Sequence, residues 1–519
     1  MNQININELL NKALALHHQG KLDDADKIYQ SVINSDENNF QANHLHGCIL
    51  SQKLNFDEAI NFLEKAISIE PNNYEANNNL GIAYKNTKNF INSEKYFKNA
   101  ISIDANNYKA FFNCANLYIE NEKYEQALSY LEKSSNADIS FPEAPQRMGE
   151  VCQYMFQNDR SLAHLHSSKK YFLLAIERDK KYADAYLMLG MSTLWLGEIS
   201  EADKLFKKVL KLNHSERYYI DNNTNKYLSD IKSLSTLIIH EYEQLTYIDN
   251  DTDDIRNPKF TKKYYDSLEN LHTKILANKL VMDDVTDDMR KDIFKILYNK
   301  PPKNMSRNLL NEKNNIPLLE SKYLNSKPEI LVVDNFLNEA ALRDLQKFCR
   351  NANIFKYPYD GGYVAAFLSK GLSNEFILQL SEDLRITYKN IFKEFRLTQA
   401  WIFKYENQKE GTNIHADQAS INVNFWITPE EGNLNKNKGG LRIWNKLPPE
   451  NSDFNFYNSV DNSPGIRKML KDNNVDNMVI PYKENRAVIF NSQLFHETDD
   501  FEFNESYENR RINITFLYD

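Results

Sequence analysis

The chain has 519 residues, of which 41% are hydrophobic, and its formal net charge is −9. This length exceeds the size at which one hydrophobic core stops growing, so we expect two to four domains. The acidic balance disfavours nucleic acid as a partner, and no apolar run is long enough to cross a membrane. The N-terminus lacks the basic and apolar regions of a signal peptide, which predicts a cytoplasmic protein.

Small residues recur every 34 positions in the first part of the chain, with one apparent insertion of seven residues. They are Ala13, Gly47, Gly81, Ala115, Gly149 and Gly190. A second small residue follows each of them twelve positions later, and a large residue comes four positions after that, as in Gly81, Ser93 and Phe97. This period is typical of helix–turn–helix solenoid repeats, in which small side chains let paired helices approach closely.

The clearest copy of the repeat is HLHGCILSQKLNFDEAINFLEKAISIEPNNYEA, which carries Gly47, Ala59, Ala66 and Pro71. On these residues, segment 5–215 resembles the tetratricopeptide repeat family. The resemblance implies about six repeats and a concave groove that binds a protein or an extended peptide. A spacer or a dimerisation element is the alternative.

The rest of the chain divides into a helical part and a strand-rich part. Residues 216–327 carry helical periodicity, for example in DIKSLSTLIIHEYEQL, and we interpret them as a helical connector. From residue 328 the pattern changes to short apolar runs such as AWIFKY, SINVNFWIT, RAVIF and INITFLY. These runs predict an antiparallel β-sandwich or barrel over residues 328–519. The predicted fold is therefore multidomain α + β, beginning with an all-α solenoid.

Three residues of the strand-rich part form a candidate metal site. His415 and Asp417 in NIHADQ are two residues apart, so their side chains project to the same side of an extended backbone. His496 follows the run RAVIF, and it is the only other histidine after His272. Two imidazoles and one carboxylate are the ligand set of non-haem Fe(II) oxygenases. Histidines that only hydrogen-bond in the core or on the surface are the alternative.

Segment 328–519 resembles the Fe(II)/2-oxoglutarate-dependent dioxygenases, in particular their prolyl-hydroxylase-like branch. The resemblance is carried by EILVVDNFLNEAALRDLQKFC, KYENQKEGTNIHAD, GGLRIW and RRINITFLYD. It implies a double-stranded β-helix (jelly roll) and hydroxylation with Fe(II), 2-oxoglutarate and dioxygen. The aspartate at position 417 favours hydroxylation over halogenation. The whole chain resembles bacterial proteins that join tetratricopeptide repeats to such an oxygenase, on VNFWITPEEGN and RAVIFNSQLFHETD.

By this resemblance Arg511 would bind the distal carboxylate of 2-oxoglutarate, a task that suits its bidentate guanidinium. Alternation along the last strand places Asn513 and Thr515 on the same face as Arg511. The full set of candidates for the cosubstrate pocket is Arg511, Tyr405, Asn424, Trp426, Asn513 and Thr515. A structural polar ladder is the alternative for the asparagines. The long segment 448–481 is expected to form a lid or a surface elaboration.

The sequence therefore predicts an Fe(II)/2-oxoglutarate-dependent dioxygenase that hydroxylates a protein or peptide recruited by the repeats. Two alternatives remain open. One is a repeat-based interaction scaffold whose oxygenase domain is inactive or serves as a sensor, and the other is an oxygenase that acts on a small molecule.

Overall fold

The computed structural model describes residues 3–214, 230–250, 261–296, 299–302, 308–359, 361–409, 413–449 and 452–519. The chain forms two compact units, Met1–Met188 and Leu189–Asp519. This division falls within one helix, at residue 188, whereas the sequence predicted a boundary at residue 215. The last predicted repeat and the predicted connector helices therefore belong largely to the second unit.

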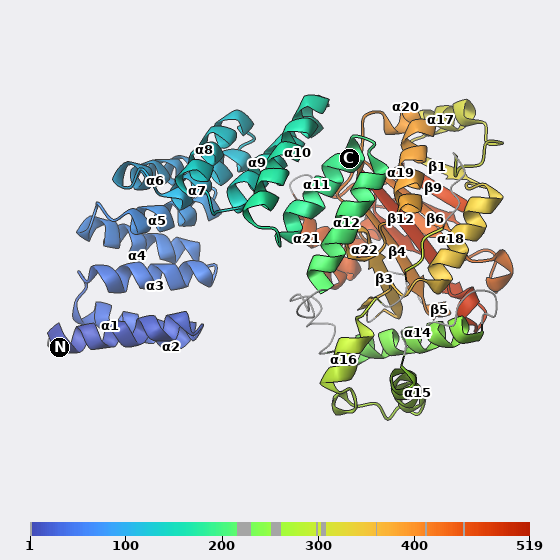
Figure 1. Cartoon of the computed structure of the whole chain (residues 1–519), viewed down its shortest axis with the longest axis horizontal. Coiled ribbons are helices and arrows are strands. Elements are labelled where there is room, and N and C mark those ends of the chain that lie inside the picture. The colour runs from blue at the N-terminus through green and yellow to red at the C-terminus, as the bar shows by residue number, and fades with distance from the viewer. Residues whose placement is uncertain are drawn as a thin grey trace. The chain divides into compact units, whose positions relative to one another are not determined.

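Helices fill the repeat region completely. Twelve helices occupy the described residues 3–214, as six helix–turn–helix repeats require, and Figure 1 shows α1 to α10 stacked in successive pairs. Their bounds are α1 Gln3–His18, α2 Leu22–Ser35, α3 Phe40–Gln52, α4 Phe56–Ile69, α5 Tyr74–Asn86, α6 Phe90–Ile103, α7 Tyr108–Glu120, α8 Tyr124–Ala137, α9 Glu143–Asp159, α10 Leu162–Arg178, α11 Ala183–Trp195 and α12 Ile199–His214. The all-helical solenoid predicted from the sequence is confirmed.

The seven-residue insertion lengthens two helices instead of forming a loop. Helices α9 and α10 have 17 residues each, whereas α7 and α8 have 13 and 14. The additional residues thus add about one turn to each helix of this pair. The repeat keeps its helix–turn–helix form across the insertion.

The periodic small residues allow the two helices of a repeat to touch. A Cβ atom added to Gly81 of α5 would lie 2.6 Å from Cδ1 of Phe97 in α6, and one added to Gly47 would lie 2.8 Å from Cγ of Leu63. The hydroxyl of Ser93 donates a hydrogen bond to the Gly81 carbonyl at 2.8 Å. Close contact between a small residue and a large one therefore repeats along the solenoid.

The C-terminal region is rich in antiparallel sheet, as predicted. Strands β1, β9, β6, β12, β4, β3 and β2 form a seven-stranded sheet in that order, and smaller sheets have the orders β10-β7-β8 and β11-β5. The strand bounds are β1 Ile330–Val333, β2 Tyr357–Tyr359, β3 Tyr363–Phe367, β4 Leu397–Tyr405, β5 Gln408–Lys409, β6 Ile421–Trp426, β7 Leu441–Trp444, β8 Asn477–Ile480, β9 Arg486–Asn491, β10 His496–Thr498, β11 Phe501–Glu502 and β12 Ile512–Tyr518. These sheets are open and antiparallel, so the sheet-rich character is confirmed and the jelly roll stays a prediction.

Helices cover the large sheet, and Figure 1 shows α18 and α19 lying across its strands. The helices of this unit after α12 are α14 Ile231–Asn250, α15 Lys262–Leu276, α16 Asp287–Ile293, α17 Ile316–Asn325, α18 Glu339–Asn351, α19 Glu375–Thr387, α20 Lys389–Phe392, α21 Phe454–Asn458 and α22 Ser463–Asp472. The face of the sheet that carries Ile402, Ile514 and Phe516 is completely buried. The opposite face also packs in a core, because Trp426, Val488 and Phe490 form a buried hydrophobic cluster with residues of β7 and β8.

Helix α14 is joined to the sheet by a buried ion pair. Glu241 accepts hydrogen bonds from Lys356 at 2.6 Å and from Asn353 at 2.9 Å. The Glu241 side chain is fully buried and that of Lys356 is 3% exposed. Burial lowers the pKa of Lys356, against the opposing effect of Glu241. The predicted connector therefore contributes a helix that is anchored within the second unit.

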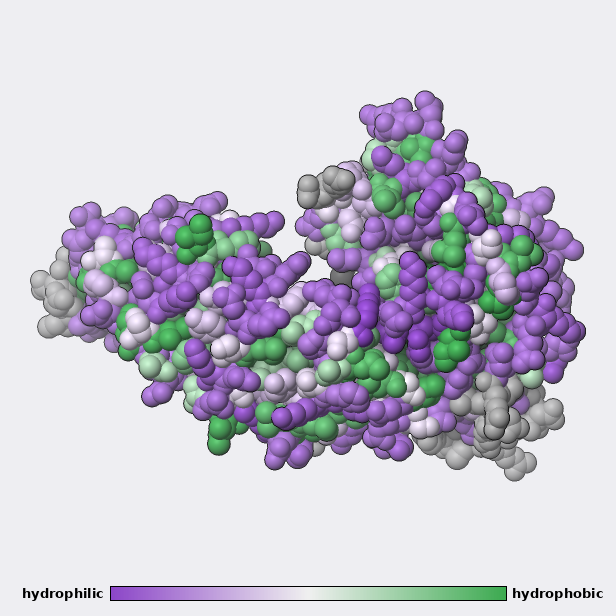
Figure 2. Space-filling model, turned by 90° about the horizontal axis from the view of Figure 1, so that it is seen from above, coloured by the Kyte–Doolittle hydropathy of each residue, from purple (hydrophilic) through white to green (hydrophobic). Residues whose placement is uncertain are grey.

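The face of the molecule drawn in Figure 2 is mainly polar. Figure 2 shows hydrophobic residues scattered among hydrophilic ones on the face that it presents. Within the described ranges, no helix combines the length and the apolar character needed to span a bilayer.

Candidate metal centre

A two-residue backbone bridge brings the two predicted histidine ligands together. The amide of His415 donates to the carbonyl of His496 at 3.0 Å, and the amide of His496 donates to the carbonyl of His415 at 2.8 Å. Asp417 is held in the same way, because its amide donates to the Ser492 carbonyl at 3.1 Å. Residues separated by about 80 positions in the sequence thus share one short piece of antiparallel backbone.

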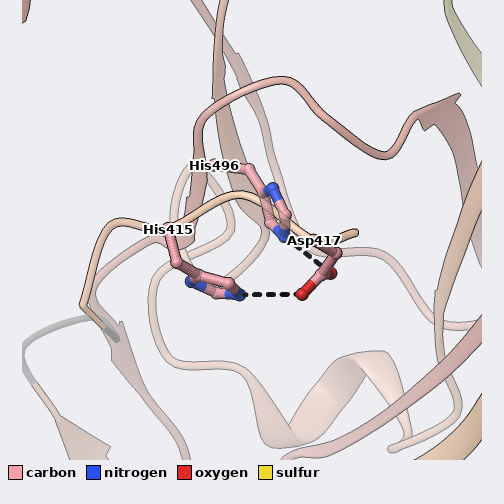
Figure 3. A group of neighbouring side chains, drawn as sticks. All are labelled: His415, Asp417 and His496. Carbon is pink, nitrogen blue, oxygen red and sulfur yellow. Dashed lines mark ion pairs between the residues drawn. The ribbon is translucent and has the colours of Figure 1, made fainter. Parts of the chain in front are cut away.

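The three side chains converge on one point. Figure 3 shows both imidazoles directed toward the carboxylate of Asp417. Nε2 of His496 lies 3.4 Å from Oδ2 of Asp417, and Nε2 of His415 lies 3.8 Å from Oδ1. One candidate ligand atom from each residue lies within 4.8 Å of the others, and this is the one such group found among the described residues.

Backbone carbonyls fix a proton on Nδ1 of both rings. Nδ1 of His415 lies 2.9 Å from the carbonyl oxygen of Asn413, and Nδ1 of His496 lies 2.9 Å from that of Leu494. A carbonyl only accepts, so each Nδ1 carries the proton and donates it. In its neutral form each ring therefore directs the lone pair of Nε2 toward Asp417, which is the arrangement that metal-binding histidines use.

Burial and hydrogen bonding set the charges of the site. Burial lowers the pKa of His415, and the nearby imidazole of His496 lowers it further. Burial by itself raises the pKa of Asp417, but the adjacent imidazoles of His496 and His415 and the hydrogen bond from Asn422 bring it below the ordinary value. Asn422 donates from Nδ2 to Oδ2 of Asp417 at 2.9 Å. The arrangement thus favours an ionised Asp417 beside a neutral His415, and these are ligand states that a divalent ion needs.

Arg511 is completely buried between aromatic rings. Its guanidinium carbon lies 5.0 Å from the ring centroid of Tyr405, 5.3 Å from that of Phe501 and 5.9 Å from that of Trp426. Nε donates to the carbonyl of Gly439 at 2.7 Å, whereas Nη1 has no hydrogen-bond partner among the described residues. Burial lowers the pKa of Arg511. A buried guanidinium without a carboxylate is costly, so this position suits an anionic ligand.

The predicted polar residues form a row across β6 and β12. Asn424 and Asn513 both donate from Nδ2 to Oγ1 of Thr515 at 3.2 Å. The buried Oδ1 atoms of both asparagines and Nε1 of Trp426 lack a hydrogen-bond partner in the described part of the chain. The protein therefore satisfies only part of the hydrogen-bonding capacity of this row. The row offers two acceptors, the Oδ1 atoms, and one donor, Nε1 of Trp426, to a polar ligand.

One cavity of about 640 Å³ brings most of the predicted residues together. The predicted residues that line it are His415, Asp417, His496, Tyr405, Asn424, Asn513 and Thr515. Arg511 and Trp426 do not line it and are buried next to Tyr405 and Tyr482. Contact between Arg511 and a ligand in this cavity therefore requires a local rearrangement beside Tyr405.

Sequence reasoning missed the support behind the ligands. Helix α22, from the segment expected to form a lid or an elaboration, buries Ile466 and Leu470 against Ile414, Ala416 and Phe495. The last three residues flank the metal ligands in the sequence. Residues 450 and 451 of this segment lie outside the described residues, and Phe454 and Asn458 of α21 line the cavity. The helical spacing of Ile466 and Leu470 is the sequence signal that indicates a packed helix here.

Comparisons with known proteins bear on the helical repeats. Models of the tetratricopeptide repeat match residues 40–73, 62–95 and 108–138. The N-terminal part of this chain consists of tetratricopeptide repeats. No curated protein matches the chain.

Several solved structures are similar to the chain, all at low identity. PilF of Pseudomonas aeruginosa shares 15% identity over 41% of this chain and 93% of its own, with a TM-score of 0.35. PilW, described as a type IV pilus biogenesis factor, shares 21% identity over 44% of this chain and 100% of its own, with a TM-score of 0.37. YrrB, described as a TPR protein with an unusual peptide-binding site, shares 18% identity over 36% of this chain and 93% of its own, with a TM-score of 0.29.

The matched repeat models all lie within residues 40–138. Among the functions considered from the sequence, they support the repeat-based protein-interaction scaffold. They give no support to the dioxygenase prediction, which rests on the residues and geometry of the C-terminal unit.

Proposed function

We propose that the C-terminal unit is an Fe(II)- and 2-oxoglutarate-dependent dioxygenase, and that the tetratricopeptide repeats recruit its protein or peptide substrate. One observation carries the proposal. The Nε2 atoms of His415 and His496 and the carboxylate of Asp417 converge in a single cavity, with both rings held in the metal-binding tautomer. Two imidazoles and one carboxylate leave the other positions of an Fe(II) ion open.

The spacing of the donor atoms fits a shared ion. Nitrogen and oxygen donors that each lie about 2.1 Å from a divalent ion are at most about 4 Å apart. The two pairs that include Asp417 are separated by 3.4 and 3.8 Å, which falls within that range. Repulsion between carboxylates does not oppose this arrangement, since Asp417 is the one carboxylate in the group.

The proposed jelly roll draws support from the strand order. A seven-stranded and a three-stranded antiparallel sheet each contribute to the site, through β4, β6 and β12 on one side and through β10 on the other. The bridge between His415 and His496 lies where β10 pairs with β7. Ligands held next to strands of two antiparallel sheets are consistent with the proposed fold.

Bound Fe(II) would supply the activation of dioxygen, with 2-oxoglutarate losing CO2 to give succinate and the substrate C–H becoming C–OH. The protein contributes position and charge. The carbonyls of Asn413 and Leu494 orient the imidazoles, and Asn422 orients Asp417. After the local rearrangement beside Tyr405, Arg511 would offer its Nη1 to the distal carboxylate of 2-oxoglutarate, in surroundings that exclude water.

Iron binding, 2-oxoglutarate binding and succinate formation test the proposal in that order. We expect the full chain to bind Fe(II) anaerobically and to form succinate from 2-oxoglutarate on exposure to air. His496→Ala should weaken Fe(II) binding by more than about 100-fold, because it removes a ligand and not merely its support. Arg511→Met should retain iron and lose affinity for 2-oxoglutarate.

Two variants serve as matched controls. His272→Ala removes a histidine that stacks on Tyr242 in the same unit, and Arg343→Met removes an arginine that is 69% exposed on α18. Both should bind iron and 2-oxoglutarate as the wild type does. If the wild-type protein binds neither iron nor 2-oxoglutarate, the proposed dioxygenase function is refuted.

A repeat-based interaction scaffold is the second candidate, and the tetratricopeptide matches favour it. In that case the C-terminal unit would be inactive or would act as a sensor. Binding of iron and 2-oxoglutarate without succinate formation, even in the presence of a partner captured by the repeats, would favour the scaffold over the enzyme.

A further inference from the structure

The cavity beside the metal centre has an aromatic half that the proposed cofactors do not use. Its aromatic residues come from the edge of the large sheet and are Tyr359, Tyr363, Phe367, Trp401 and Phe403. They share one face because β3 and β4 pair in register, with Phe367 opposite Trp401 and Tyr363 opposite Tyr405. All five are partly exposed. The cavity therefore presents a wall of accessible ring surface next to the ligands.

The rings of this wall already pack on one another. Tyr359 and Tyr363 are stacked with centroids 4.6 Å apart and planes 7° from parallel, and Phe403 lies 5.1 Å from Tyr363 in an edge contact. Side chains that hold each other in this way bind a ligand with little loss of conformational freedom. The wall is thus a preformed surface for C–H groups.

Neutral amides line another part of the cavity. Gln399, Asn413, Gln418 and Asn458 all line the cavity and are exposed. Each side-chain amide both donates and accepts, which matches the N–H and C=O groups of a peptide backbone. Among the described residues that line the cavity there is no lysine, arginine or glutamate, and the one carboxylate is the ligand Asp417.

We infer that the cavity takes an uncharged, hydrocarbon-rich side chain of a polypeptide, which is the residue that is hydroxylated. This inference rests on the proposed function. The side chain would lie against Trp401 and Phe403, and the adjacent peptide groups would bond to the amides. A charged side chain would lose its hydration here without gaining a partner, so the site excludes it.

Positional peptide pools test the inference with the full chain. Each pool contains capped pentapeptides with one fixed central residue and random neighbours, supplied with Fe(II), 2-oxoglutarate and air. We expect pools with central leucine, valine, proline or phenylalanine to gain one oxygen atom at least about ten times faster than pools with lysine, arginine, aspartate or glutamate. A pool of neutral oligosaccharides is tested in parallel, because sugars also pack on aromatic rings.

Variants link the preference to the wall and the amides. Trp401→Ala should raise the KM for the apolar pools about tenfold and leave the affinity for Fe(II) and 2-oxoglutarate unchanged. Phe456→Ala is the matched control, since Phe456 is 52% exposed on α21 and does not line the cavity. Gln399→Glu places a carboxylate in the cavity without a change of size, so it should increase the relative rate of the lysine pool.

The outcomes separate this inference from the proposed function. Equal rates for charged and apolar pools, or oxidation of the oligosaccharide pool alone, would overturn the inference. Succinate formation that no peptide pool stimulates would overturn it as well, while leaving the oxygenase in place. Absence of iron and 2-oxoglutarate binding would instead show that the proposed function itself has failed.

Discussion

The repeat unit and the sheet-rich unit use contacts of very different range in the sequence. In the repeats, Gly81 packs on Phe97 and Gly47 packs on Leu63, only 16 positions away in each case. In the sheet-rich unit, the decisive contacts join His415 to His496 and Glu241 to Lys356. Short-range contacts repeat with the sequence, whereas long-range contacts depend on the topology. Packing between neighbours in the sequence therefore organises one unit, and pairing between distant segments organises the other.

Tryptophan fluorescence can monitor one unit separately. All four tryptophans, Trp195, Trp401, Trp426 and Trp444, belong to the sheet-rich unit. Far-ultraviolet circular dichroism, in contrast, reports the helices of both units, including α1 to α10 of the repeat unit. The two signals together assign a change in stability to its unit.

The largest effect is expected from Glu241→Ala. This change leaves the ammonium of Lys356, which is 3% exposed, without its partner. Breaking a buried ion pair in this way costs about 3–5 kcal/mol. Urea unfolding followed by tryptophan fluorescence should shift accordingly. The double variant Glu241→Ala/Lys356→Met should recover much of the loss, and a single variant as stable as wild type would contradict the role given to α14.

Asn422→Ala should weaken Fe(II) binding by about 10–100-fold, because Asn422 orients the ligand Asp417. Anaerobic titration with Fe(II) in the absence of 2-oxoglutarate measures the change. Asn424→Ala is the matched control, since Asn424 lies on the same face of β6 and bonds to Thr515 instead. Equal affinities of the two variants would show that the hydrogen bond from Asn422 does not matter.

Gly81→Ala should destabilise the repeats by about 1–3 kcal/mol through overpacking. The new Cβ would lie 2.6 Å from the Phe97 ring, so the two helices must separate. We expect the transition seen by circular dichroism to move and that seen by tryptophan fluorescence to stay. Adding Phe97→Leu should restore part of the stability, and a fluorescence shift of equal size would show that the units unfold together.

The smallest effect is expected from Asp334→Asn, which removes an ion pair near the surface. Arg486, followed by Lys483, lowers the pKa of Asp334 below 3.8. Because the pKa is lower in the folded state, the ion pair adds stability at pH values above the unfolded pKa. This stability is lost as the pH falls through the folded pKa. The variant should therefore melt at a slightly lower temperature than wild type at neutral pH, and the difference should vanish in strong acid. A difference that persists there would mean that Asp334 acts by packing.

The periodic features of the chain could be predicted, because each depends on neighbours in the sequence. The 34-residue spacing of Gly47 and Gly81 predicted the helix pairs, and alternation in SINVNFWIT predicted the shared face of Asn424 and Trp426. The extent of the second unit could not be predicted, because α14 joins it through Glu241 and Lys356, which lie 115 positions apart.

The candidate site illustrates the same limit. The sequence indicated which residues could bind a metal, since two histidines and an aspartate are chemically suited to it. It did not indicate that Asn422 bonds to Asp417, or that Arg511 is buried behind Tyr405 outside the cavity. These relations depend on rotamers and on packing between strands, and the spacing of residues along the sequence does not encode either of them.

The sequence by itself thus determined the repeats, the strand-rich character of the C-terminal region and the identity of the candidate ligands, because periodicity and side-chain chemistry are local properties. Only the tertiary structure decided that His415 and His496 share a backbone bridge and that an aromatic wall adjoins them. Both depend on which strands pair and in what register, and strand pairing is settled by the burial of the whole sheet.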